Sequence, residues 1–310
     1  MFYDESTIPE LLPPHEDGVF KTLLTREEAS PVLRDIVESF LRFPVKSVTV
    51  RNVELPITDI NEKRERFDVN CTVDDGSQLC VEMQADQMPG DSISSGHKKV
   101  KNRAIYYLCD LHAKQHGRGI AYENLMRSYQ MTFCGYTLFP DRDNFVSRFS
   151  FRDENSIELS DSLGIIFIEL TKLGEVIKKP VNTMTGEEAW ASFFAYASNP
   201  DYKDLISKLV TERKEIKMAE EMLHTISKDE IERARFRSRH MFQMDLQDGL
   251  LTARGEGRAE GLAEGEAKGE AKGRAEGKAE IALKLRNAKA LSNEEISQFT
   301  GLSLSEVEKL

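Results

Sequence analysis

One short segment holds the residues best placed to do chemistry. It reads RFDVNCTVDDGSQLCVEMQ and covers residues 66–84. Two runs of alternating polar and apolar residues flank the turn sequence at 74–76, whose glycine favours a three-residue hairpin loop. Such a loop fixes the register of the two strands, and counting back from it sets Asp68 opposite Glu82. Gln84 lies two residues beyond Glu82 and therefore on the same face of the sheet.

The predicted register places two carboxylates, those of Asp68 and Glu82, with their Cβ atoms roughly 5 Å apart. Like charges in that position repel, which is unfavourable in a purely structural sheet. Magnesium binds through one or two carboxylates, keeps several waters and takes further ligands from phosphate oxygens. It can then activate a water molecule and stabilise charge on a phosphodiester. The alternative is a solvated sheet face, because a D…ExQ pattern is weak evidence by itself.

The elements around this hairpin follow from the period of the apolar residues. The pattern predicts helices from near residue 16 and over 31–43, strands within 45–84, a helix over 97–116, and further strands over 129–139, 146–152 and 163–170. Together these elements predict one mixed α/β domain. We place the boundaries at 12–180 for this domain, 181–250 for a charged helical region around Trp190, 251–280 for a glycine repeat and 281–310 for a small helix-turn-helix-like cap.

Three blocks occur in a specific order and spacing along the chain. They are HEDGVFKTLL, ERFDVNCTVDDGSQLCVEMQ and NRAIYYLCDLHAKQHGRGIAYENL. Together they resemble the recombination-promoting nuclease / putative transposase family of the PD-(D/E)XK nuclease superfamily, over roughly residues 12–180. The resemblance implies a restriction-endonuclease-like mixed sheet flanked by helices, followed by an α-helical C-terminal region. It also implies a Mg²⁺-dependent deoxyribonuclease that acts on DNA in recombination or in mobile elements.

Carried over by position, the resemblance implies catalytic roles for four residues of this chain. Asp68 matches the motif aspartate and Glu82 the second metal carboxylate. Gln84 stands where many superfamily members have lysine, and an amide offers only neutral hydrogen bonds. Asp17 matches an acidic residue on the first helix that closes the site. The alternative for Asp17 is an acid favoured by the helix dipole at an N-terminus.

A basic strip follows the hairpin. Between residues 98 and 118 there are six Lys or Arg residues and one acid, a local charge of +5 in a chain of net charge −11. DNA affinity comes mostly from neutralising phosphates, so we expect this strip to contact the DNA backbone; the alternative is a solvated helix face. The predicted DNA-binding residues are Lys98, Lys99, Lys101, Arg103, Lys114 and Arg118.

The glycine repeat places a glycine at every fourth residue over 257–277. Each interior glycine costs a helix roughly 1 kcal/mol relative to alanine. Close helix–helix contact, a flexible linker and direct contact with DNA each explain the pattern. We expect a homo-oligomer that assembles through the C-terminal helices. Two capping boxes, at Ser292 with Glu295 and at Ser303 with Glu306, predict two short terminal helices.

Composition narrows the function classes. The net charge of −11 argues against a surface covered in basic residues. The longest apolar run, 164–170, is too short to span a bilayer, and the acidic N-terminus lacks the apolar region of a signal peptide. The four cysteines show no CxxC pair, so we expect buried free thiols and a cytoplasmic protein. The rivals to a DNA endonuclease are a nuclease-fold protein that binds DNA without cutting it and an oligomeric protein-interaction scaffold.

Overall fold

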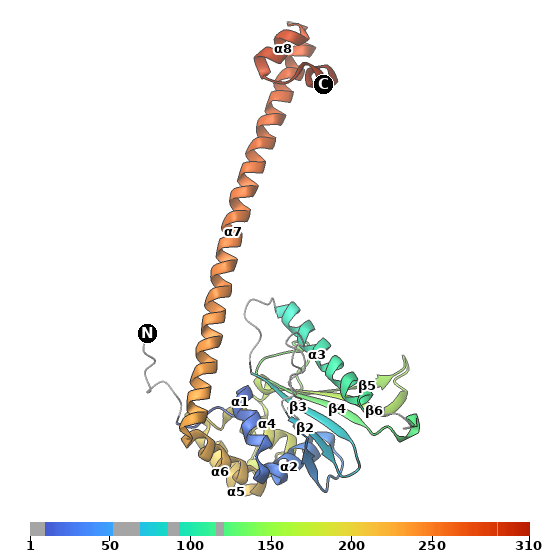
Figure 1. The fold of residues 1–310 in the computed structure, drawn as a ribbon, viewed down its shortest axis with the longest axis vertical. Helices are drawn as coiled ribbons and strands as arrows, with labels where there is room; N and C mark the ends of the chain where they lie inside the picture. The colour runs from blue at the N-terminus through green and yellow to red at the C-terminus, as the bar shows by residue number, and fades with distance from the viewer. Residues whose placement is uncertain (1–9, 52–68, 86–92, 116–120, 290) are drawn as a thin grey trace. The chain divides into compact units, whose positions relative to one another are not determined.

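The computed structural model describes residues 10–51, 69–85, 93–115, 121–289 and 291–310. The chain divides into two compact units, Met1–Gln243 and Met244–Leu310. The first unit contains a mixed sheet with helices packed against it (Figure 1). The second contains most of one long helix and two short ones.

Six strands form a single sheet in the order β1-β2-β3-β4-β6-β5. Strand β4 is parallel to both of its neighbours, and the remaining pairs are antiparallel. The strands are β1 (Val48–Val50), β2 (Val69–Val73), β3 (Gln78–Gln84), β4 (Ser128–Cys134), β5 (Val146–Arg152) and β6 (Glu158–Glu169). This mixed sheet flanked by helices confirms the predicted fold class.

The β2–β3 hairpin has the predicted register. Its ladder pairs Val69 with Val81 and Cys71 with Leu79. Gly76 has φ of +88°, the left-handed conformation that the three-residue loop requires. The predicted pair of Asp68 with Glu82 would continue this ladder, but Asp68 lies outside the described residues.

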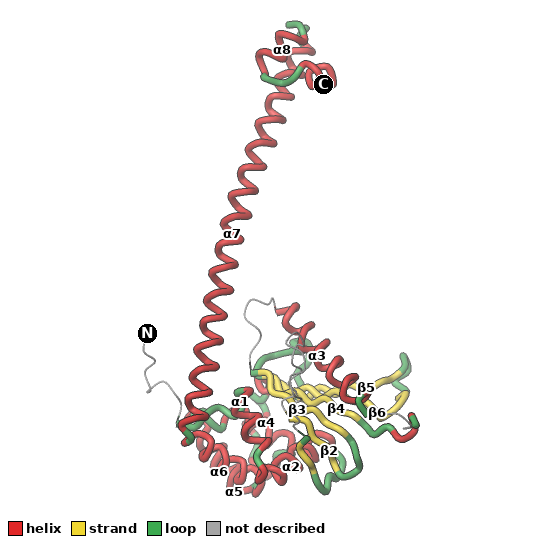
Figure 2. The backbone as a smooth tube through the Cα atoms, in the orientation of Figure 1, coloured by secondary structure: helices red, strands yellow, loops and turns green. Residues whose placement is uncertain are grey.

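One face of the sheet is apolar and carries the main core. Rings from three helices meet Phe133 of β4, with centroid distances of 5.6 Å to Phe20, 5.3 Å to Phe40 and 5.1 Å to Phe194. Trp190 packs on Phe194 and so belongs to this same core. The helices of this layer are α1 (Asp17–Thr25), α2 (Ser30–Leu41), α4 (Gly186–Tyr196), α5 (Lys203–Glu212) and α6 (Lys214–Lys228). Figure 2 shows them grouped together beside the sheet.

Helix α3 (Ile93–Ala113) covers the other face, which is more polar. It contacts β3, β4 and β6. Ala104 of α3 packs on Phe167 and Cys134 in a small second cluster, and His112 Nδ1 lies 3.0 Å from Ser128 Oγ near the helix end. Short 3₁₀ helices form further connections: η2 (Glu27–Ala29), η3 (Tyr122–Asn124), η4 (Leu170–Lys172), η5 (Val176–Lys178), η6 (Val181–Thr183) and η7 (Pro200–Tyr202).

The C-terminal unit is helical. Helix α7 (Glu230–Asn287) begins in the first unit and includes the whole glycine repeat; α8 (Asn293–Thr300) and α9 (Leu304–Lys309) follow it. Ala282, Ile296 and Val307 form a small core between these three helices. Both predicted capping boxes are present.

Three sequence-based expectations need adjustment. Helix α3 begins at Ile93, before the predicted residue 97. The strand predicted over 129–139 ends at Cys134. The next residue, Gly135, passes so close to Ala85 that an added Cβ would lie 2.1 Å from the Ala85 carbonyl oxygen. Three cysteines are buried as expected, but Cys109 is exposed, since it lies on the face of α3 that points away from the sheet. Among the helices described, none is long and apolar enough to cross a membrane.

Candidate active site

Glu82 is the centre of the candidate site. It lies on the face of β3 that α3 covers, and it is only 4% exposed. Its Oε1 accepts a hydrogen bond from Gln84 Nε2 at 2.8 Å and lies 2.8 Å from Arg103 Nη2. Its Oε2 accepts a hydrogen bond from Gln130 Nε2 at 3.2 Å. Three elements, β3, α3 and β4, therefore hold this one carboxylate.

The electrostatics of Glu82 are those of a buried acid. Burial raises its pKa to about 7, the Arg103 guanidinium opposes this shift, and the negative charge of Asp17 adds to it. Asp17 is the first residue of α1, and its charge reaches the Glu82 carboxylate. The structure therefore brings two of the four predicted catalytic residues, Asp17 and Glu82, within electrostatic range of each other.

Gln84 also points toward this carboxylate. Its Nε2 donates to Glu82 Oε1 and, at 3.0 Å, to the Met83 carbonyl. The amide therefore supplies a neutral donor beside Glu82. Asp68, the fourth predicted catalytic residue, lies outside the described residues.

A row of buried polar residues on β4 completes the site. Thr132 lies opposite Glu82 in the parallel ladder. Gln130 is two residues before Thr132 and therefore lies on the same face of β4. Both side chains are fully buried. Sequence reasoning missed this row, although SYQMTFC alternates polar and apolar residues in the middle of a sheet that helices cover on both sides. That alternation was the available signal.

Several buried polar atoms around Glu82 have no hydrogen-bond partner within the part of the chain that the structure describes. These atoms are Gln130 Oε1 on β4, and Arg103 Nε and Nη2 on α3. The Nη2 atom forms the ion pair with Glu82, but without the alignment of a hydrogen bond. Buried polar atoms are nearly always paired with protein groups or ordered water, so these atoms are suited to contact water, a ligand or an ion.

The donors near Glu82 suit a hard divalent cation. They are oxygens of a carboxylate, an amide and a hydroxyl, and such ligands match Mg²⁺ rather than a softer metal. Across the described ranges, no cluster of three or more His, Cys, Asp or Glu residues is arranged to hold a metal ion.

The predicted basic strip divides into residues with different surroundings. Lys98 and Lys99 are exposed near the start of α3. Lys101 Nζ lies 4.3 Å from the centre of the Phe139 ring, and Lys114 Nζ lies 2.5 Å from Asp110. Arg103 turns inward to Glu82, while Arg118 falls in a stretch that the structure does not describe.

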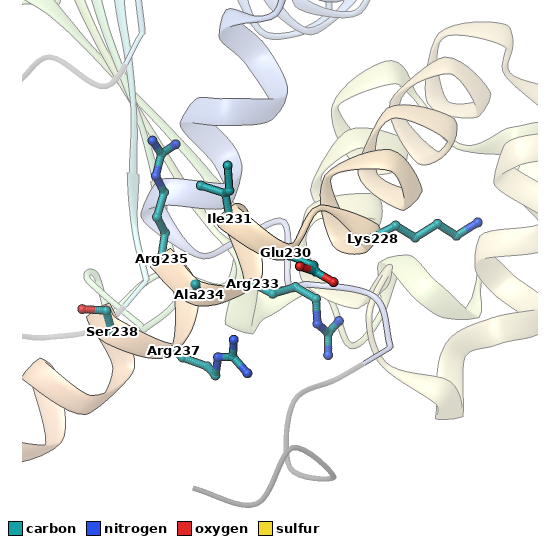
Figure 3. Close-up of a pocket in the computed structure, with 8 residues that line it drawn as sticks. All are labelled: Lys228, Glu230, Ile231, Arg233, Ala234, Arg235, Arg237 and Ser238. Carbon is teal, nitrogen blue, oxygen red and sulfur yellow. The ribbon is translucent and has the colours of Figure 1, made fainter.

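A hollow of about 1050 Å³ lies at the start of α7. Figure 3 shows Arg233 and Arg237 pointing to the same side of the helix, with Arg235 on the other. The lining residues are Lys228, Glu230, Ile231, Arg233, Ala234, Arg235, Arg237 and Ser238. Four of them are basic and one is acidic, and none was predicted as a site residue.

Comparison with known protein families identifies the fold. The model of one family, described as PD-(D/E)XK nuclease family transposase, matches residues 14–253. The chain belongs to this family. No curated protein and no solved structure gives a significant match.

The extent of the match clarifies which elements make up the PD-(D/E)XK domain. It continues past residue 180 and includes α4, α5 and α6. These are the helices that carry Trp190 and Phe194 into the core of the sheet. The restriction-endonuclease-like sheet and its helical layer therefore form one packed structure in this PD-(D/E)XK protein.

Proposed function

We propose that the protein is a Mg²⁺-dependent endonuclease that hydrolyses phosphodiester bonds in DNA. The observation that carries the proposal is the buried carboxylate of Glu82 on the sheet of a PD-(D/E)XK protein, which is paired with Arg103 and is within electrostatic range of a second acid, Asp17. A buried acid with a strongly raised pKa and a specific charge partner is typical of a functional site.

Asp68 and Glu82 would hold the metal, which when bound supplies an activated water and stabilises phosphate charge. Gln84 fixes one oxygen of Glu82 and offers its amide to groups that approach this carboxylate. Arg103 places a permanent positive charge at the site. Its Nε and Nη2 donors make no hydrogen bond among the described residues, and they are suited to phosphate oxygens.

Two basic surfaces are available for the DNA backbone. One is the start of α3 with Lys98 and Lys99, and the other is the hollow at the start of α7 with Lys228 and Arg237. Phosphate contacts position a protein on the duplex without reading sequence. We therefore infer DNA binding with little sequence preference from these surfaces, in a protein that serves recombination or mobile elements.

A plasmid assay tests the proposal. Supercoiled plasmid is incubated with the purified protein in Mg²⁺ and in EDTA, and a gel-shift measurement in EDTA reports DNA binding. The proposal expects nicked or linear DNA in Mg²⁺ only, with binding in both conditions. Binding without cleavage in any divalent cation would support the non-cleaving DNA-binding alternative instead.

A further inference from the structure

Gln130 is a fully buried amide in the middle of β4. Its Nε2 donates to Glu82 Oε2 at 3.2 Å and lies 3.2 Å from Thr132 Oγ1. A buried amide is unfavourable unless its hydrogen bonds are made. An apolar side chain in this position would leave Oε2 of the buried Glu82 without the hydrogen bond that Gln130 donates to it.

The oxygen of the same amide, Gln130 Oε1, is buried and accepts no hydrogen bond from the residues that the structure describes. Leaving a buried carbonyl unpaired destabilises the folded protein. This half-satisfied amide indicates a role beyond packing, and its N–H groups reach two buried side chains, Glu82 and Thr132.

The two oxygens of Glu82 depend on different elements. Oε1 has two partners, Gln84 from its own strand and Arg103 from α3. For Oε2, the contact that the structure provides is the amide of Gln130. With Oε2 fixed to β4 and Oε1 fixed between β3 and α3, the plane of the carboxylate is set. Without Gln130, the carboxylate could rotate about the Arg103 contact.

We propose that Gln130 is a positioning residue for the metal ligand Glu82: its amide N–H orients Oε2, and its buried Oε1 accepts a hydrogen bond from a water on the hydrated cation. An amide oxygen only accepts hydrogen bonds, and water bound to a divalent cation is a donor. Residues that orient metal ligands in this way are typically important for affinity. The proposal rests on the proposed function, because it requires Glu82 to bind a cation.

The test replaces Gln130 with an apolar residue of similar size, Gln130→Met. Titration calorimetry with Mn²⁺ or Mg²⁺ in the absence of DNA measures the cation affinity, and thermal unfolding in EDTA measures stability. The expected result is a cation affinity roughly 10- to 100-fold weaker in a variant that still unfolds cooperatively and is fully folded at the temperature of the titration. Loss of affinity in a protein that remains folded is the signature of a positioning role.

Ser128→Ala is the matched control. Ser128 is equally buried on the same face of β4, but it contacts His112 and Gln115 rather than Glu82. This variant should bind the cation like the wild type. If its affinity falls as far as that of Gln130→Met, then removing any polar group from β4 has this effect, and the positioning role is overturned.

Other results of the cation titration separate a failure of this proposal from a failure of the proposed function. Wild-type cation affinity in Gln130→Met overturns the proposal while leaving the proposed function intact. If the wild type itself binds no divalent cation and cleaves no DNA, the proposed function fails instead. Should Gln130→Met not fold, Gln130→Leu removes the same two amide atoms and carries the same prediction.

Discussion

At Glu82, burial and charge act in opposite directions. Removal from water favours the protonated acid, whereas Arg103 favours the carboxylate. Burial prevails in the metal-free protein, and the pKa rises to about 7. The site thus tolerates a neutral acid when no cation is bound. A bound cation would reverse this balance and favour the ionised form.

This shift predicts how the metal-free protein responds to pH. Because the folded-state pKa of Glu82 lies above its ordinary value of 4.5, the folded protein retains a proton that the unfolded chain releases. This stabilisation is complete below about pH 4.5 and disappears as the pH rises through about 7, on the order of 3 kcal/mol in all. Urea unfolding in EDTA, compared between wild type and Glu82→Gln at several pH values, measures this decline. Identical pH dependence in the two proteins would contradict the prediction.

Gln84 permits a second prediction at the residue scale. Gln84→Lys keeps a donor toward Glu82 Oε1 and adds the charge found in many superfamily members, so cleavage should be retained or increased. Gln84→Leu is the matched variant without a donor, and its cleavage rate should fall roughly 10- to 100-fold. Plasmid cleavage rates in Mg²⁺ measure both. Complete inactivity of Gln84→Lys would show that the amide itself has a specific role.

At the scale of elements, the hairpin was predictable because its information is local. The loop at Gly76 sets the register, and the alternating residues then determine which face is apolar. The partners of that hairpin were not predictable in the same way. The spacing of apolar residues in a helix shows which face is buried, but not which element that face packs against. The sequence therefore predicts a separate helical region around Trp190, whereas in the structure Trp190 belongs to the main core beside the sheet. The contact of Gln130 with Glu82 depends on parallel pairing between β3 and β4, which the sequence does not specify.

The start of α3 carries a prediction about DNA binding. Replacing Lys98, Lys99 and Lys101 with Gln should weaken binding equally on unrelated DNA sequences, because phosphate contacts carry no sequence information. The slope of log affinity against log salt should fall by about 1 for each phosphate that the variant no longer neutralises. Fluorescence anisotropy at several salt concentrations measures both quantities.

The hollow at the start of α7 offers the comparison for this experiment. Lys228→Gln with Arg237→Gln removes two positive charges from that surface. If the slope of log affinity against log salt is unchanged in the α3 variant and reduced in this one, the DNA backbone contacts the start of α7 rather than α3. If DNA affinity and its salt dependence are unchanged in both variants, both surfaces are solvated helix faces without a role in DNA binding.

At the scale of the whole molecule, α7 is the least explained element. Its six repeat glycines lie in a continuous helix, and for each of them a Cβ would meet nothing within 4 Å in the described chain. Larger residues would therefore fit, and each glycine costs roughly 1 kcal/mol of helix stability relative to alanine. Packing against another helix would offset this cost, since glycine permits close approach of two backbones.

If the glycine face packs in an oligomer, Gly265→Leu with Gly269→Leu should shift the assembly toward monomer. Helix content should rise at the same time, because leucine is the better helix former. Light scattering and circular dichroism measure the two effects. Ala263→Leu with Ala267→Leu, on a different face of the same turns, is the control and should leave the mass unchanged. An unchanged mass in the glycine variant would remove this face from any role in assembly.

The proposed function assigns metal-dependent DNA cleavage to the buried carboxylate of Glu82. Its role is tested most directly by the rate of plasmid cleavage in Mg²⁺ by Glu82→Gln, with Glu158→Gln, an exposed acid at the start of β6, as the control. We expect the Glu82→Gln rate to fall roughly 100- to 1,000-fold while the variant still folds and binds DNA, and Glu158→Gln to cleave like the wild type. Asp68→Asn should be impaired in the same way. Cleavage by Glu82→Gln at the wild-type rate would show that this carboxylate does not serve the reaction.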